Sequence, residues 1–455
     1  MQNQPNSKNS LESSKTSNKL KVINDMDLKE ATGLIQDMMA ERDGFSSDET
    51  AYWEKIKDDA MAGEIGAGQK ATEFIAKVMD RHGITVKGME TYETAYEIYK
   101  YAWGMDAIEE LYNQPDVDEI RVNSYNMIKV QRRGKNESTD IKLKDNEHVM
   151  MIIGRLVRHD RGVGLTESTP SIESMRRDGT RITATCPPLS KTATLVLRKH
   201  DTFKMDLENL TKAGTLDKQI HAYLRLLVSG RSNILLSGGC GSGKTSLLRY
   251  LVSFLHPGLR IISMENDVEL KLGEHYPARD IVEFEEHPEL KLTLRHLFRI
   301  ALRYSPDLMI IGEMRGVGEA DETIKACTRG HDGSMGTGHF NSVEEAVEGT
   351  ALMLLEEGKN LPLDLAKLQV ARAFNIVVQM YSSTVHGIKK ITNIAEIWPE
   401  GNNVEVRNLV TWKPNPDNYF QGEWVIENLP SERLLKKMHQ YGVNIKDFKK
   451  MEVVT

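Results

Sequence analysis

A phosphate-binding loop is the clearest chemical signal in this chain. The run Gly238-Gly239-Cys240-Gly241-Ser242-Gly243-Lys244-Thr245 matches G-x-x-x-x-G-K-[ST] without a gap. In such a loop the glycines let successive backbone N–H groups face one anion, Lys244 adds a positive charge, and the hydroxyl of Thr245 binds Mg²⁺. We therefore predict that this run and the following Ser246 bind ATP with Mg²⁺.

The segments on either side of this run are those that a phosphate-binding loop requires. Residues 233–237 are typical of a short buried strand, and apolar residues recur at helical spacing over residues 247–255. An ordinary glycine-rich turn is the alternative interpretation, but it does not explain why a strand precedes the run and a helix follows it. The loop is predicted to join these two elements.

Hydrolysis of a nucleotide also needs a carboxylate that orients the attacking water. Glu313 follows the apolar strand predicted at 308–311, at the edge where acidic residues of nucleotide-binding sheets meet the phosphates. Glu313 is the predicted water-orienting residue. The position before it, where an Mg²⁺-holding aspartate often lies, is Gly312, and Asp307 stands at the other end of the strand. Metal binding is therefore expected to come partly from elsewhere.

Two further glutamates follow the strand predicted at 259–264. Glu265 and Glu269 are placed to bind the metal through water, and Glu269 joins Thr245 as a predicted metal residue. Taken without their context, the same acidic residues would be a solvated surface turn.

The glycine-rich stretch at 330–342 contains His331 and His339. No cysteine or third histidine accompanies them, so a zinc site is not indicated. The predicted role is to sense a phosphate or a subunit contact. Taken alone, either histidine is more often a structural hydrogen-bonding group.

The composition favours a multidomain globular protein with protein partners. The 455 residues are too many for one hydrophobic core. No apolar run approaches the roughly 18–20 residues that span a bilayer, and the three widely spaced cysteines fit a reducing compartment. The net charge of −7 weakens the case for a broad nucleic-acid-binding face.

The residue patterns predict several successive regions. They are a disordered tail at 1–20, a helical module at 21–88, an α+β domain at 89–203, a linker at 204–218, an α/β domain at 219–400, and a C-terminal extension at 401–455. Ser46 to Glu49 form a capping box that opens one helix of the module. The α/β domain is expected to be a mostly parallel sheet with helices on both faces.

Together these motifs resemble the type II/type IV secretion ATPase superfamily, in particular the branch of tight-adherence pilus and conjugation ATPases related to the VirB11 proteins. The segments that carry the resemblance stand in family order: 238–245, 265–269, 307–313 followed by Arg315-Gly316, and 330–342. The amino-terminal half adds Val122-Asn123, Thr166 to Pro170, Asp178 to Arg181, and Leu197 to Lys199. The resemblance covers roughly residues 100–400.

The resemblance implies a RecA-like ATPase domain preceded by a PAS-like α+β domain, in a hexameric ring that sandwiches ATP between the two. The resemblance assigns phosphate and Mg²⁺ binding to Lys244 and Thr245, and polarisation of water to Glu313. It assigns support of the metal to Glu265 and Glu269. His339 would couple the γ-phosphate to the ring, and Arg181 and Arg198 would make further contacts with the nucleotide. As isolated residues in strands, these two arginines would be surface charges.

By the same resemblance, the protein is a cytoplasmic ATPase at the inner face of the membrane. It would power assembly of a pilus-like filament, or secretion, through inner-membrane platform or secretion-channel proteins. A conjugation ATPase is the alternative within the class. A nucleic-acid motor of RecA type and a non-hydrolysing nucleotide-gated scaffold are alternatives from other classes. No direct sequence-specific nucleic-acid binding is expected.

Three positions depart from the family pattern. Asn266 replaces the aspartate of the acidic box, which predicts weaker metal binding or a shift of work to Asp267. Met175 stands where relatives have an arginine, with the next two arginines as possible substitutes, and Phe340 stands where the family favours alanine. The tetracysteine zinc module of some relatives is missing.

Overall fold

The computed structural model describes residues 26–42, 44–160, 162–199, 204–314 and 318–452. The predicted tail at 1–20 and the pair Arg315-Gly316 lie outside these residues. The chain divides into two compact units, Met1–Gln131 with Glu137–Thr202, and Arg132–Asn136 with Phe203–Thr455. Among the helices described, none combines the length and apolarity needed to cross a bilayer.

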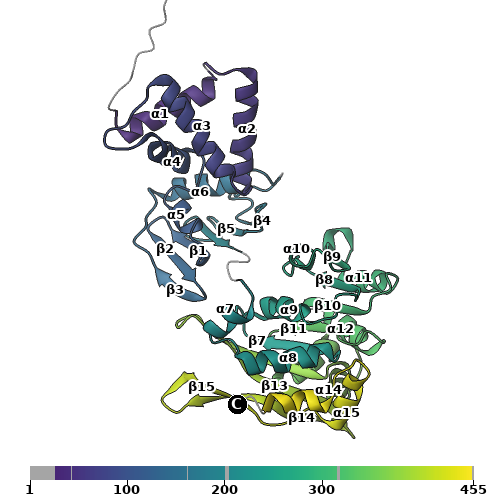
Figure 1. Ribbon diagram of the computed structural model, residues 1–455. Helices are drawn as coiled ribbons and strands as arrows, with labels where there is room; N and C mark the ends of the chain where they lie inside the picture. The colour runs from purple at the N-terminus through teal and green to yellow at the C-terminus, as the bar shows by residue number, and fades with distance from the viewer. Residues whose placement is uncertain (1–25, 43, 161, 200–203, 315–317, 453–455) are drawn as a thin grey trace, which may run out of the picture. The chain divides into compact units, whose positions relative to one another are not determined.

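The first unit begins with four helices that pack around a core of their own. They are α1 (Leu28–Glu41), α2 (Ser47–Ala62), α3 (Ala67–His82) and α4 (Thr91–Ala102). The capping box predicted at the start of α2 is confirmed, because Ser46 accepts the N–H of Glu49 and the Glu49 carboxylate accepts the N–H of Ser46. Figure 1 shows these helices gathered at one end of the unit.

The rest of the first unit is an antiparallel sheet with helices against it. The elements are α5 (Ile108–Tyr112), β1 (Val117–Ser124), β2 (Met127–Arg132), β3 (Lys135–Ser138), α6 (Asn146–Leu156), β4 (Ser171–Met175), β5 (Arg181–Thr185) and β6 (Thr194–Arg198). The strand order is β3-β2-β1-β6-β5-β4. Alternate residues such as Leu195 and Leu197 face a core shared with α6, as expected for a sheet with one face covered.

Two arginines in the β4–β5 connection attach the sheet to helix α2. Arg176 is 7% exposed; it donates to the Ala60 carbonyl at 3.1 Å and stacks over the Tyr112 ring at 4.8 Å. Arg177 is half exposed and pairs with Asp59 at 2.6 Å. These contacts direct both guanidinium groups toward α2.

Arg176→Ala is therefore expected to destabilise the first unit by about 2–4 kcal/mol, since it empties a packed site and removes a hydrogen bond to a buried carbonyl. Urea unfolding followed by tryptophan fluorescence measures this, because Trp53 and Trp103 are in contact within the unit. The exposed ion pair makes Arg177→Ala the control, with an expected loss of at most about 1 kcal/mol. Equal losses for the two variants would show that burial of Arg176 is not what stabilises the junction.

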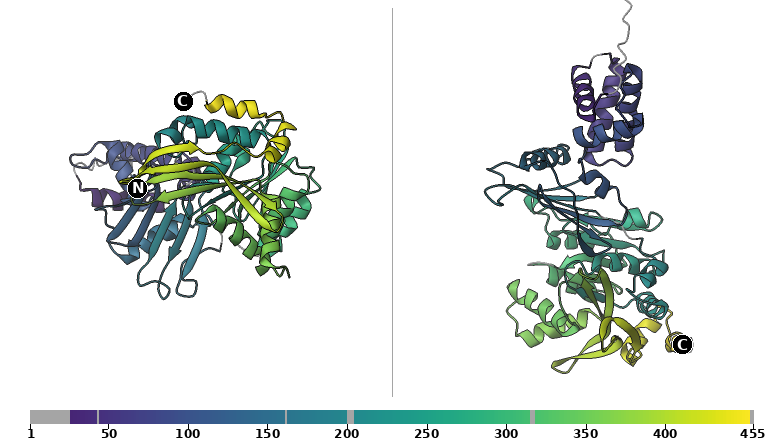
Figure 2. Two further views of the ribbon diagram at one scale, coloured as in Figure 1. Left: turned by 90° about the horizontal axis from the view of Figure 1, so that it is seen from below. Right: turned by 90° about the vertical axis from the view of Figure 1, so that its left-hand side faces the viewer.

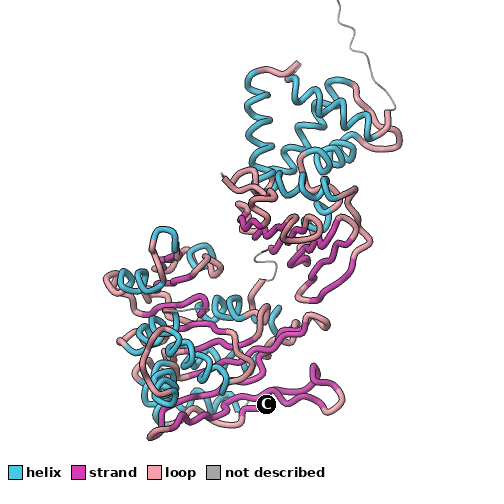
Figure 3. Tube along the Cα trace, turned by 180° about the vertical axis from the view of Figure 1, so that it is seen from behind, coloured by secondary structure: helices cyan, strands magenta, loops and turns pink. Residues whose placement is uncertain are grey.

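The second unit is built on a nine-stranded sheet. Its strands are β7 (Ile234–Gly238), β8 (Ile261–Glu265), β9 (Ile281–Glu285), β10 (Leu308–Met314), β11 (Met335–Gly338), β12 (Ile376–Ser383), β13 (Ile388–Glu400), β14 (Asn403–Asn415) and β15 (Asn418–Ile426). The order is β15-β14-β13-β12-β7-β11-β10-β8-β9. The six strands from β12 to β9 run parallel, and β13 to β15 extend the sheet antiparallel. Figure 3 draws all of these strands in magenta.

Helices cover both faces of this sheet. They are α8 (Lys218–Ser229), α9 (Lys244–Val252), α10 (Leu272–His275), α11 (Leu294–Ala301), α12 (Glu319–Thr328), α13 (Val343–Glu356) and α14 (Leu363–Ala373). Within β7, Ile234 and Leu236 belong to the core formed with α8 and α9, whereas Leu235 belongs to the core formed with α11 to α14. A parallel sheet between two cores confirms the predicted α/β architecture.

Both ends of this unit contribute to the same core. Residues 204–218, predicted as a linker, include α7 (Leu207–Lys212) and the buried Leu210 and Leu216. The predicted C-terminal extension supplies β14, β15, α15 (Glu432–His439) and α16 (Ile445–Glu452). Figure 2 shows α16 alongside α8, where the rings of Phe448 and Tyr223 lie 5.1 Å apart.

Candidate functional site

The carboxyl ends of β7, β11, β10 and β8 lie at one edge of the parallel sheet. These four strands are neighbours in that order, so the residues that follow them meet there. An open pocket lies at this edge, lined by Thr245, Glu265, Asn266, Asp267, Glu269, Gly312 and Glu313. Four residues predicted to serve nucleotide and metal therefore line one pocket: Thr245, Glu265, Glu269 and Glu313.

The phosphate-binding loop connects β7 to α9, as predicted. Gly243 precedes α9 with a φ of 91°, a conformation that disfavours side chains. Lys244, Thr245 and Ser246 form the first turn of α9, so this helix N-terminus faces the loop. The hydroxyl of Ser242 is buried and has no hydrogen-bond partner among the described residues.

Position 238 requires glycine because neighbouring atoms leave no room for a side chain. A Cβ at this position would lie 2.6 Å from Ser242 Oγ and 2.7 Å from the Met380 carbonyl oxygen of β12. Because the second atom belongs to backbone, it cannot rotate away, and an added methyl group must displace the loop.

Gly238→Ala is expected to weaken ATP binding by about tenfold to a hundredfold, the cost of overpacking by 1–3 kcal/mol. Isothermal titration with Mg²⁺ and ATP measures the change. Gly239→Ala is the matched control, since its Cβ would meet no atom within 4 Å. Equal affinities for the two variants would contradict the steric explanation.

Lys244, His339 and Glu313 form a chain of contacts across the site. The Lys244 ammonium donates to the carbonyls of Gly238 and Gly239 at 2.9 and 3.0 Å and lies 3.4 Å from His339 Nδ1. The other ring nitrogen, Nε2, contacts the Glu313 carboxylate. If Nε2 donates to Glu313, Nδ1 accepts from Lys244, so one neutral imidazole connects the loop to the carboxylate.

Glu265 fills the space beside Gly312. A Cβ at Gly312 would lie 2.6 Å from Glu265 Cγ, so the side chain of Glu265 occupies the volume that a residue larger than glycine would need. Its Oε2 accepts the N–H groups of Glu269 and Leu270 at 3.0 Å, and its buried Oε1 has no partner among the described residues. Burial raises the pKa of Glu265 to about 7, against the lowering effect of the two N–H donors.

The donor set fits Mg²⁺ with a nucleotide phosphate. Thr245 offers a hydroxyl, and the carboxylates of Glu265, Glu269 and Glu313 line the same pocket. Hard oxygen ligands such as these, with water completing the shell, are those that Mg²⁺ prefers.

The two histidines of the glycine-rich stretch lie at opposite ends of β11. His339 follows the strand and reaches the site, whereas His331 precedes it and contacts the Pro306 carbonyl at 3.1 Å. Phe340 fits because glycines face its ring: a Cβ at Gly338 or Gly349 would lie 2.5 or 2.3 Å from a ring carbon. The phenylalanine is thus matched by Gly349, a residue nine positions further along the chain.

Arg181 and Arg198 lie in the first unit. They are direct partners on the adjacent strands β5 and β6, and Arg198 is exposed. Their nucleotide contacts stay predictions.

Sequence reasoning missed three residues near the site. The Gln379 amide donates to the Phe340 carbonyl at 3.1 Å and so supports the end of β11. Glu286 and Glu319 both accept hydrogen bonds from Asn266. No sequence motif marks these residues. Gln379 stands on β12, Glu286 follows β9 and Glu319 begins α12, and only the fold brings these segments together.

Comparisons with known proteins identify the family of this chain. The family model described as "Type II/IV secretion system protein" matches residues 102–390. An uncharacterised protein of Methanocaldococcus jannaschii is 32% identical over 240 residues, 49% of this chain and 32% of that protein. The type IV secretion system protein VirB11 of Brucella suis is 26% identical over 333 residues, 65% of this chain and 89% of VirB11.

This chain thus spans about a third of the length of the first relative and most of the second. Among solved structures, the crystal structure of the VirB11 ATPase of Brucella suis in complex with sulphate is 25% identical. The match covers 64% of this chain and 93% of that one, with a TM-score of 0.36.

Proposed function

Because this chain belongs to the type II/IV secretion system protein family, in its VirB11-like branch, we propose that it is an ATPase that powers secretion or the assembly of a pilus-like filament. The reaction is the attack of water on the γ-phosphate of ATP, which releases ADP and phosphate.

One observation carries this proposal. The phosphate-binding loop and the carboxylate of Glu313 lie at the same edge of one sheet and are connected through His339. Lys244 stabilises the phosphate charge. Glu313 orients the attacking water from the carboxyl end of β10, which is separated from β7 by β11. A surface loop with an unrelated acidic turn would not place an imidazole in contact with both groups.

Mg²⁺ would be held by the hydroxyl of Thr245 and, through water, by Glu269, with Glu265 shaping that loop. When bound, it neutralises charge on the phosphate oxygens. In this proposal His339 reports the presence of the γ-phosphate, because it contacts both Lys244 and Glu313. Arg181 and Arg198 would contact the nucleotide from the first unit as bidentate cations.

We further propose that six copies form a ring at the cytoplasmic face of the membrane, recruited by inner-membrane platform or secretion-channel proteins. In this ring, ATP hydrolysis moves the first unit relative to the second. Transfer of DNA in conjugation is the second candidate, supported by the similarity to a putative conjugal transfer protein of Mycobacterium tuberculosis, which is 33% identical over 167 residues.

Phosphate release by the purified chain, measured with and without single-stranded DNA, tests the class of motor. We expect turnover that DNA leaves unchanged. The active species should have six times the 51.4 kDa mass of the chain. Turnover that requires DNA would instead support a nucleic-acid motor. A monomer that hydrolyses ATP at full rate would refute the ring.

A further inference from the structure

The amide of Asn266 joins two carboxylates from different elements. Its Nδ2 lies 2.7 Å from Glu286 Oε2 and 3.0 Å from Glu319 Oε1. An ionised carboxylate only accepts hydrogen bonds, so both contacts must use the two N–H donors of the amide. An ionised aspartate at this position would offer no donor and would add a third negative charge.

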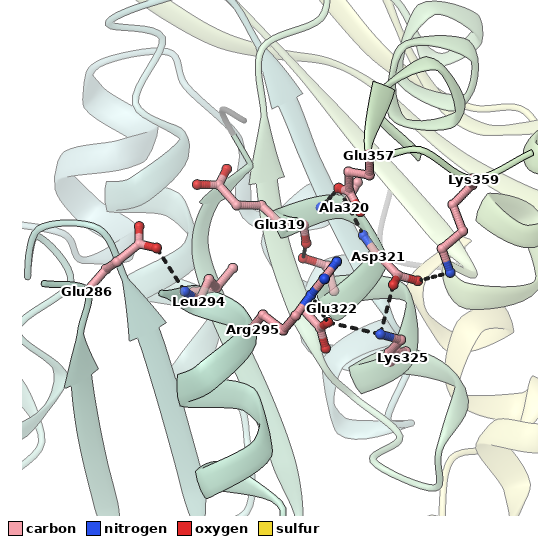
Figure 4. A network of polar contacts seen from close by, with 11 residues as sticks. Glu286, Leu294, Arg295, Glu319, Ala320, Asp321, Glu322, Lys325, Glu357 and Lys359 are labelled. Atoms are coloured by element: carbon pink, nitrogen blue, oxygen red, sulfur yellow. Dashed lines mark hydrogen bonds and ion pairs between the residues drawn. The ribbon is translucent and has the colours of Figure 1, made fainter. Parts of the chain in front are cut away.

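Each glutamate is itself held in place. Glu286 follows β9, where its Oε1 accepts the N–H of Leu294 at 2.8 Å and its own N–H donates to the Glu265 carbonyl at 2.9 Å. Glu319 is the first residue of α12 and is 6% exposed. In Figure 4 its carboxyl group points toward the side on which Glu286 lies.

Ala320 and Asp321, the next residues of α12, have other partners. Glu357 accepts the N–H of Ala320 at 3.1 Å, and Asp321 pairs with Lys325 and Lys359 at 2.7 Å. These partners anchor α12 to itself and to the end of α13 (Figure 4). The bond from Asn266 to Glu319 instead joins α12 to a wall of the catalytic pocket.

We propose that Asn266 is a positioning residue that fixes the segment containing Glu265 and Glu269 relative to the start of α12. The inference rests on the proposed ATPase function. Glu313 stands on β10, which pairs with β8, and it lines the same pocket as Glu269. A bridge that fixes the segment after β8 therefore also fixes the metal-binding side chain relative to the water-orienting carboxylate. Asparagine at this position is therefore matched to two glutamates and is not a weakened metal ligand.

Asn266→Asp tests the proposal, because it preserves shape while replacing two donors with a negative charge. We expect kcat to fall by about tenfold to a hundredfold, as for a misplaced catalytic group. KM for ATP should stay within about twofold, since the phosphate loop is untouched. A kcat equal to or above that of the wild type would overturn the inference.

A reversed hydrogen-bond pattern separates positioning from general damage. In the triple variant Asn266→Asp, Glu286→Gln, Glu319→Gln, the two new amides donate to one central carboxylate with nearly unchanged shapes. This variant should recover most of the lost kcat. If it stays as slow as Asn266→Asp, hydrogen bonding at this bridge is not what sets the rate.

Asn402→Asp is the charge-matched control, because Asn402 is exposed in a turn far along the chain. It should leave kcat unchanged.

Thermal unfolding of every variant gives a second measurement that does not depend on turnover. Asn266→Asp should lower the melting temperature, and the triple variant should restore it. An inactive wild type would refute the ATPase proposal, whereas unchanged melting in Asn266→Asp would refute the bridge.

Discussion

Lys244→Ala is expected to abolish tight ATP binding. The side chain is 5% exposed, and its ammonium lies between the loop carbonyls and His339, so the variant removes the only side-chain cation within the phosphate-binding run. Loss of one partner of a buried, hydrogen-bonded charge pair costs about 2–5 kcal/mol. The dissociation constant should therefore rise by roughly 30-fold to several thousandfold.

Titration calorimetry with Mg²⁺ and ATP measures the affinity of this variant. Lys218→Ala, which removes an exposed lysine at the start of α8, is the control and should bind as the wild type does. Unaltered affinity in Lys244→Ala would mean that the loop does not bind phosphate.

Glu313→Gln is expected to separate binding from hydrolysis. The substitution keeps the size of the side chain but removes the negative charge that orients water, an effect worth about a hundredfold to ten-thousandfold in rate. ATP binding should be retained, because the loop and Lys244 are unchanged. Rapid-quench measurement of ADP formation after ATP binding follows the chemical step.

Glu344→Gln is the matched control, since Glu344 is an exposed glutamate in the first turn of α13. It should hydrolyse ATP at the wild-type rate. If Glu313→Gln retained that rate as well, another residue would have to orient the water.

The central part of the fold follows directly from sequence patterns. Apolar runs over β7, β8 and β10 predict buried parallel strands, and the residues directly after parallel strands must meet at one edge. For this reason Glu265 and Glu313 could be placed together from the sequence alone. The gathering of Lys244 and Thr245 beside them follows from the same rule.

Side-chain partners across elements were not predictable in this way. Asn266 reads as a lost charge in the sequence, yet in the fold its amide meets Glu286 and Glu319. Arg176 reads as a possible substitute for the arginine that relatives have in place of Met175, and in the fold it is buried against α2. Such pairings depend on which faces of distant elements come into contact, and neither spacing nor periodicity records that information.

Release of inorganic phosphate from ATP by the purified chain tests the central claim most directly. With Mg²⁺ present, we predict steady multiple turnover by the wild type, which stops when the metal is chelated and is lost in Glu313→Gln. A folded wild-type protein that binds ATP with Mg²⁺ but releases no phosphate would contradict the claim and would leave a nucleotide-gated scaffold in its place.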